Sequence, residues 1–353
     1  MALTSKQIAR LMRSSGKTVI SPEHLNYAGR VCENYAVRKL FRWEDKAALA
    51  GYKLLKAAQK DIRETAYYYA SQVRVDEIGN DANSITFRCM LNRYITQRLG
   101  QFAYDIAAQA FAYAITAYGA GWYLRQWQIQ QAAHKPQGFV PQRLSVNRAS
   151  ANVLQPGLSE AIRPNMGMYD YAGNEWRDSY INATTSGILK AKSAVNRTLT
   201  KPASVTQVVQ DVTDTLGTDN ENPKGLYHST QLNTRAAVIR SFSHASADAY
   251  GTHTEWVIGA MWITRNDGRV CPLCARQHGR VFVINDLFGM ALLGLPPDGT
   301  HFGCRCDIIP LMFPVERPND PPEDSFDEWL DEWGFADELD VFMSDTQLES
   351  TQL

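Results

Sequence analysis

Two stretches near the C-terminus decide how the last part of the chain folds: RNDGRVCPLCARQHGRVF at 265–282 and LPPDGTHFGCRCDIIP at 295–310. Cys271 and Cys274 form a C-x-x-C pair, and Cys304 and Cys306 form a C-x-C pair. Zinc prefers four thiolate or imidazole ligands in a tetrahedron, and two short pairs joined by a loop supply them at little ordering cost. The pattern indicates a structural metal site.

The choice of ligands stays open at this level. If only one cysteine of the C-x-C pair binds, His301 can complete the set, and His278 is a weaker candidate. The candidate zinc ligands are therefore Cys271, Cys274, His301, Cys304 and Cys306. Reduced thiols packed without a metal are one alternative, and a disulfide formed in an oxidising medium is another. A catalytic cysteine is disfavoured, because paired cysteines suit a closed site better than a reactive one.

Upstream of these pairs, the pattern predicts helices and then a strand. Ser204 is expected to cap a helix that ends at Gly217 and buries Val205, Val208, Val209, Val212 and Leu216. A second helix is expected to start at Asn233, with Val238, Phe242, Ala245 and Ala249 on its apolar face and Arg235, Arg240 and His244 on its other side. Residues 256–264 predict a strand, followed by a turn at 266–268.

The N-terminal part predicts a helical bundle over 22–128, starting at Ser21-Pro22-Glu23. Residues 106–124 are apolar enough to resemble a membrane span, but Gln109, Thr116 and two glycines favour a buried bundle helix, so we expect no membrane contact. Residues rich in Pro, Gly and Asn follow, which favours an extended arm. The fold class predicted is mainly α with a small α+β C-terminal module stapled by a Cys/His cluster. The expected domains are 1–133 (bundle), 134–183 (arm), 184–314 (module) and 315–353 (acidic tail).

Charge divides the chain unevenly. Residues 316–353 hold 13 acidic residues and one basic residue, a net −12, while residues 1–315 carry a net +11. Four cations recur on one predicted helix face at Lys53, Lys56, Lys60 and Arg63. Such a stripe could contact DNA phosphates, although a solvated helix face is the commoner meaning.

The acidic tail also carries an apolar pattern. Phe326, Trp329, Leu330 and Trp333 fall at i, i+3, i+4 and i+7, with acidic residues between them. An amphipathic helix of this kind can dock in a groove on a partner protein with a basic rim, or fold back on its own chain. We expect docking on a neighbouring protein, and a disordered tail is the third alternative.

The cysteine module resembles the C-terminal signature of the phage head morphogenesis family, the Mu protein F-like minor head proteins, over about residues 185–312. The matching residues are Trp262, Asp267, Arg269, Cys271, Cys274, Gly279, Pro297, His301, Cys304, Arg305 and Cys306. The chain departs from the signature at 298–300, which lengthens the spacing from Pro297 to His301.

The resemblance implies a non-catalytic minor head protein that enters the procapsid in few copies, binds the portal protein and touches packaged DNA. It also implies a location inside the capsid, after assembly in the host cytoplasm beside the major capsid protein. Two alternatives remain: a zinc-stapled nucleic-acid-binding protein outside the virion, and an enzyme related to the toxins that some relatives carry. Against an enzyme, the sequence has no metal–carboxylate cluster, phosphate-binding Gly loop or paired acid/base motif.

Overall fold

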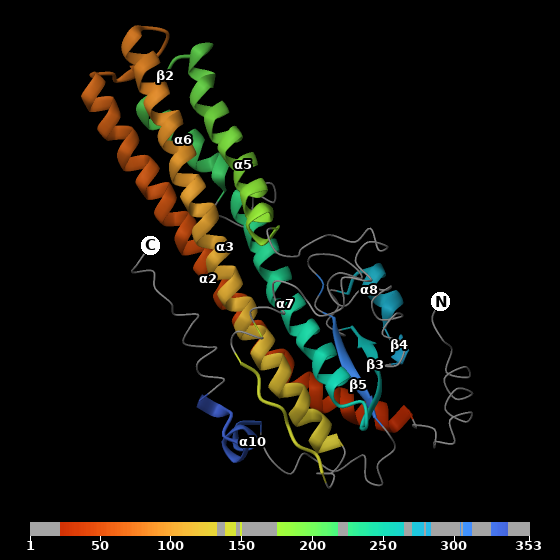
Figure 1. Cartoon of the computed structure of the whole chain (residues 1–353). Helices are drawn as coiled ribbons and strands as arrows, with labels where there is room; N and C mark the ends of the chain where they lie inside the picture. The colour runs from red at the N-terminus through yellow and green to blue at the C-terminus, as the bar shows by residue number, and fades with distance from the viewer. Residues whose placement is uncertain are drawn as a thin grey trace. The chain divides into compact units, whose positions relative to one another are not determined.

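Most of the described chain is helical. The computed structural model describes residues 22–132, 138–145, 149, 175–217, 225–264, 270–278, 280–283, 304, 306–312 and 326–337, with side chains described from Trp43 in the first helix. The helices are α2 (Pro22–Val73), α3 (Ala82–Ala132), α5 (Glu175–Asn196), η2 (Arg197–Leu199), α6 (Val205–Leu216), α7 (Leu226–Thr252), α8 (Pro272–Gln277) and α10 (Phe326–Trp333) (Figure 1). The strands are β1 (Glu77–Ile78), β2 (Ala203–Ser204), β3 (Val257–Ile263), β4 (Val281–Val283) and β5 (Asp307–Met312). A mainly α fold with a small C-terminal sheet and a cysteine cluster is therefore confirmed.

The chain forms two compact units that do not follow sequence order. Unit 1 comprises residues 1–44, 112–172 and 236–353, and unit 2 comprises 45–111 and 173–235. Helices α2, α3 and α7 each contribute residues to both units. The units are interleaved in the sequence because three continuous helices run from one unit into the other. The four consecutive domains expected from the sequence stay a prediction.

Unit 2 is built on amphipathic helices. In the first half of α3 the buried positions recur every three or four residues, at Phe87, Leu91, Ile95, Leu99 and Phe102. Helix α6 confirms its predicted limits and its predicted buried residues. The Ser204 hydroxyl accepts a hydrogen bond from Gln207 N at 3.2 Å, and Gly217 ends the helix at a φ of 56°.

Two boundaries were predicted wrongly in unit 2. Helix α5 begins at Glu175, so the last residues of the expected arm are helical, and Tyr180 is buried with its hydroxyl 3.0 Å from that of Thr234. Helix α7 begins at Leu226 rather than Asn233. Leu226 is buried where its side chain meets Gly187 of α5, so packing extends α7 beyond its sequence signal.

Unit 1 contains the second half of α3, where all residues from 116 to 131 are buried. Helix α7 packs closely on it, since a Cβ added at Gly121 would lie 3.0 Å from the Phe242 carbonyl oxygen. The expected polar side of α7 is also corrected here, because Arg240 is buried and His244 is half-buried. A helix covered on several sides cannot keep one face for solvent.

The C-terminal sheet of unit 1 has the antiparallel order β4-β3-β5, with Ala260 opposite Phe282 and Trp262 opposite Ile308. Strand β3 confirms the strand predicted at 256–264. The turn expected at 266–268 lies outside the described residues. Among the helices described, none has a stretch that is both long and apolar enough to span a bilayer.

An extended segment at 138–145 crosses the buried half of α3. The Trp122 indole donates to Gln142 O at 2.9 Å, and Leu144 N donates to the Tyr123 hydroxyl at 3.0 Å. The Gln126 amide bonds both the N–H and the C=O of Gln142. Side chains of α3 thus satisfy a backbone that has no strand partner in the described structure.

Candidate metal centre

The first cysteine pair is organised by the start of α8. Cys271 is the N-cap residue of this helix, and its sulfur accepts a hydrogen bond from Cys274 N at 3.3 Å. Pro272 takes the first helical position, where its missing N–H costs nothing and its fixed φ suits the helix. This local geometry carries Cys274 into a buried position.

The second pair leads into β5. Cys304 and Cys306 are both buried, and Cys306 N donates to the Cys304 sulfur at 3.4 Å. Cys274 Sγ lies 3.7 Å from Cys304 Sγ. The sulfur atoms of Cys274, Cys304 and Cys306 all lie within 4.8 Å of one another, so residues thirty positions apart converge on one point.

These distances fit a shared metal ion. A Zn–S bond of about 2.3 Å gives a tetrahedral S···S edge of about 3.8 Å, close to the 3.7 Å observed. A disulfide would require about 2.05 Å between the sulfurs, and these cysteines are free thiols. The donor set is three soft sulfur ligands, which suit zinc, copper(I) or iron–sulfur chemistry.

The protonation of the cluster depends on whether a cation is bound. The hydrogen bond with Cys304 and burial raise the pKa of the Cys306 thiol well above its ordinary value. The thiol therefore stays protonated when no cation is bound, and a metal bound here would displace the protons and neutralise the thiolates.

Trp262 on β3 adds independent support. Its side chain is 1% exposed, and its indole N–H lacks a conventional hydrogen-bond partner among the described residues. The same indole lies beside Cys306 and acts to lower the pKa of that thiol. A buried donor is costly when unsatisfied, and a metal-bound thiolate would accept its hydrogen bond.

The other predicted ligands have different positions. Cys271 is partly buried against the same apolar cluster, but its sulfur does not join the group of three. The His278 ring accepts hydrogen bonds from the backbone N and the hydroxyl of Thr264 at 3.1 Å and 3.0 Å, so this side chain fastens α8 to the end of β3. His301 lies outside the described residues.

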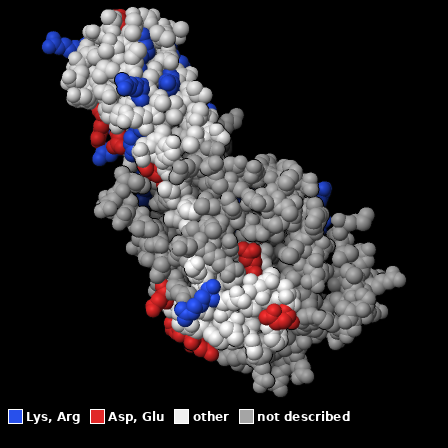
Figure 2. Space-filling model, viewed as in Figure 1, with Lys and Arg blue, Asp and Glu red and all other residues white. Residues whose placement is uncertain are grey.

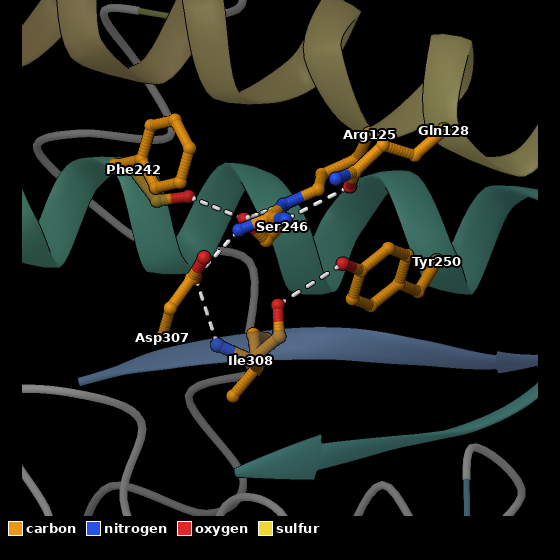
Figure 3. Close-up of polar contacts among 7 residues, drawn as sticks. All are labelled: Arg125, Gln128, Phe242, Ser246, Tyr250, Asp307 and Ile308. Atoms are coloured by element: carbon orange, nitrogen blue, oxygen red, sulfur yellow. Dashed lines mark hydrogen bonds and ion pairs between the residues drawn. The ribbon is translucent and has the colours of Figure 1, made fainter. Parts of the chain in front are cut away.

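A buried ion pair beside the sheet was not predicted. Arg125 of α3 donates to the Asp307 carboxylate at 2.5 Å, immediately after the second cysteine pair (Figure 3). Arg125 is the one charged residue in the stretch from 106 to 133. This isolated charge was the signal available in the sequence, because a charge within an apolar helix needs a buried partner.

The predicted tail helix is present as α10, but its apolar face is covered by its own chain. Phe326, Trp329 and Leu330 are buried, and the Trp329 indole hydrogen-bonds the Gln130 side chain of α3. Trp333 is half-buried. The expectation that this face docks on another protein is thus corrected to the fold-back alternative, because its aromatic side chains complete the core of unit 1.

The predicted basic stripe lies on the surface of α2. The side chains of Lys53, Lys56, Lys60 and Arg63 are all exposed. Lys60 lies 3.8 Å from Glu64, and the ammonium of Lys56 lies 5.5 Å from the Tyr52 ring centre. The described surface carries charges of both signs (Figure 2). DNA contact by the stripe stays a prediction.

Neither protein-family models, nor curated proteins, nor solved structures include a match to this chain. Any assignment of function therefore depends on the cysteine module and its surroundings.

Proposed function

We propose that this protein is a non-catalytic minor head protein of a tailed phage, whose C-terminal module is held together by one structural zinc ion. The observation that carries the proposal is the convergence of Cys274, Cys304 and Cys306 beside Trp262 in one small sheet module. These are residues through which the sequence resembles the head morphogenesis family. Their convergence supports a common module rather than a chance spacing of cysteines.

A structural role fits the site better than catalysis. All three converging thiols are buried, and a catalytic zinc site needs an open position for water or substrate. Zinc held here would link Cys274 of α8 to the residues that lead into β5. Cys271 is the nearest candidate for the fourth ligand, because its sulfur already contacts the Cys274 backbone at 3.3 Å.

The partners proposed are the portal protein and the major capsid protein, with the protein located in the capsid interior and assembled in the host cytoplasm. Residues 1–315 carry a net +11, which supports a contact with packaged DNA. Such a contact would be independent of sequence and would weaken steeply with salt.

The metal is tested by zinc analysis of the full-length protein purified under reducing conditions without chelators. We expect about one zinc per chain, lost in Cys304→Ser and retained in Cys89→Ser. Cys89 is an exposed cysteine of α3 and is the matched control. Zinc-free wild-type protein would leave packed thiols as the better description of the cluster.

The biological role is tested by co-expression with the portal protein of the genome that encodes this chain, followed by affinity capture. We expect wild-type protein to capture the portal and Cys304→Ser to capture less, because the module loses its shape. Wild-type protein that is folded and zinc-loaded but captures neither portal nor capsid protein would contradict the proposed role without affecting the metal site.

A further inference from the structure

The fully buried Arg125 guanidinium lies in a polar cluster formed by α3, α7 and β5. Its exposed fraction is 0%. Nε donates to the Ser246 hydroxyl at 2.9 Å, Nη1 donates to Gln128 Oε1 at 2.8 Å, and Nη2 donates to Asp307 Oδ1 at 2.5 Å. The guanidinium carbon lies 5.0 Å from the Phe242 ring centre, within cation–π range. Figure 3 shows these groups converging from the two helices and the strand.

The same end of β5 is also hydrogen-bonded to α7. The Tyr250 hydroxyl donates to Ile308 O at 3.2 Å, and Ile308 N donates to the Asp307 carboxylate at 2.8 Å. The first two residues of β5 are therefore held by side chains of both helices. The Asp307 carboxylate accepts two hydrogen bonds, one from Arg125 and one from the backbone N–H of Ile308.

Asp307 also follows Cys306 directly in the sequence. One planar peptide bond joins the two residues, so a change in the backbone at Cys306 also reaches the start of β5 at Asp307. The bond from Arg125 to Asp307 is charge-assisted, and such bonds depend on the position of both groups. A buried guanidinium left without its carboxylate is costly, so a shift at the cysteines also disturbs the helices.

We propose that the Arg125–Asp307 ion pair couples metal binding at the cysteine cluster to the packing of α3 on α7. This inference rests on the metal site of the proposed function. Bound metal fixes Cys304 and Cys306, which holds Asp307 in place for Arg125. Metal loss frees the start of β5, and the α3–α7 contact around Ser246 loosens with it. Asp307 is a positioning residue in this device and no metal ligand.

The test is amide hydrogen exchange of the full-length protein with and without zinc. In wild type, chelation is expected to speed exchange about tenfold at 118–128 and 242–250, besides its effect on β3 and β5. In Asp307→Asn, zinc still binds, but these helical segments exchange at the fast rate whether or not zinc is present. The control Asp331→Asn alters an exposed carboxylate of α10 and keeps the wild-type response.

Asp307→Glu serves where Asp307→Asn does not fold, because it keeps the charge but moves it by one methylene. It should bind zinc and show a smaller helical response than wild type. A zinc-loaded wild type in which chelation changes exchange only in the sheet overturns the coupling and leaves the metal site intact. Wild-type protein that binds no zinc overturns both.

Discussion

The two halves of α3 are buried in different ways. In residues 82–111, within unit 2, buried positions recur at helical spacing on one face, and besides apolar side chains they include Ser84 and Arg88. In residues 116–131, within unit 1, every position is buried, including Arg125 and four glutamines. The first half is buried on one face, where Arg88 bonds Thr198, whereas the second half is buried on every side and needs a polar partner for each of its polar side chains.

Two arginines on this helix show the difference. Arg98 bonds Asp61 at 2.7 Å in unit 2, with both side chains partly exposed. Arg125 bonds Asp307 at 2.5 Å in unit 1, with the arginine fully buried. The two ion pairs have similar bond lengths, but only the Arg125 side chain is shielded from water. A buried pair that loses one partner leaves an unpaired charge without water, and an exposed pair does not.

The largest effect is therefore expected from Arg125→Met. It should lower the free energy of unfolding by about 3–5 kcal/mol, because Asp307 is left largely buried without its cation. The matched change Arg98→Met should cost less than about 1 kcal/mol. Urea unfolding monitored by circular dichroism measures both. Equal losses in the two variants would show that burial does not separate the two halves of α3.

Two glycines of α3 provide the next comparison. A Cβ at Gly121 would lie 3.0 Å from both the Ala245 side chain and the Phe242 carbonyl, so Gly121→Ala must push α7 away. We expect a loss of about 1–3 kcal/mol. At Gly100 a Cβ would have no atom within 4 Å, so Gly100→Ala should stabilise the helix by about 0.5–1 kcal/mol. Thermal unfolding of the two variants should shift in opposite directions, and a common direction would contradict the close packing at Gly121.

A smaller loss is expected where the tail helix meets α3. Trp329→Phe removes the indole that hydrogen-bonds Gln130 and should cost about 1–2 kcal/mol, because the buried amide is left unsatisfied. Trp333→Phe is the control, since its indole N–H has no hydrogen-bond partner among the described residues. The urea midpoints of the two variants measure the difference. A larger drop in the urea midpoint for Trp333→Phe than for Trp329→Phe would contradict the hydrogen bond between Trp329 and Gln130.

The smallest effect concerns His253, which is buried, stacked on Phe139 at 4.8 Å and bonded to Gln126 at 3.0 Å. Burial lowers its pKa from the ordinary 6.5, and Glu255 opposes this only in part. The unfolded chain therefore takes up the proton first as pH falls. The contribution to stability is present above pH 6.5 and is lost progressively below it.

His253→Gln should flatten this dependence. The urea midpoint of wild type is expected to fall more between about pH 7.5 and about pH 5.5 than that of the variant. Parallel midpoints in the two proteins would show that His253 carries no share of the acid sensitivity.

The sequence predicted well wherever one local signal was enough. The Ser204 cap, the Gly217 end and the valine spacing of α6 each act within a few residues, and the strand at 257–263 has a continuous apolar run. The cysteine cluster was predictable because short pair spacings already restrict the geometry. Burial of α10 and the Arg125–Asp307 pair were not predictable, since both depend on segments about 180 to 200 residues apart. An acidic amphipathic pattern is equally compatible with docking on another protein and with packing on its own chain.

The buried half of α3 also has a consequence for synthesis on the ribosome. Gln130 and its partner Trp329 are separated by 199 residues, which at 5–20 residues per second corresponds to about 10 to 40 s of translation. During that interval an apolar, glutamine-rich helix segment has left the exit tunnel before its covering strand and tail helix exist. Nascent chains that end before residue 326 should therefore bind chaperones that shield hydrophobic segments. Full-length chains should no longer bind these chaperones.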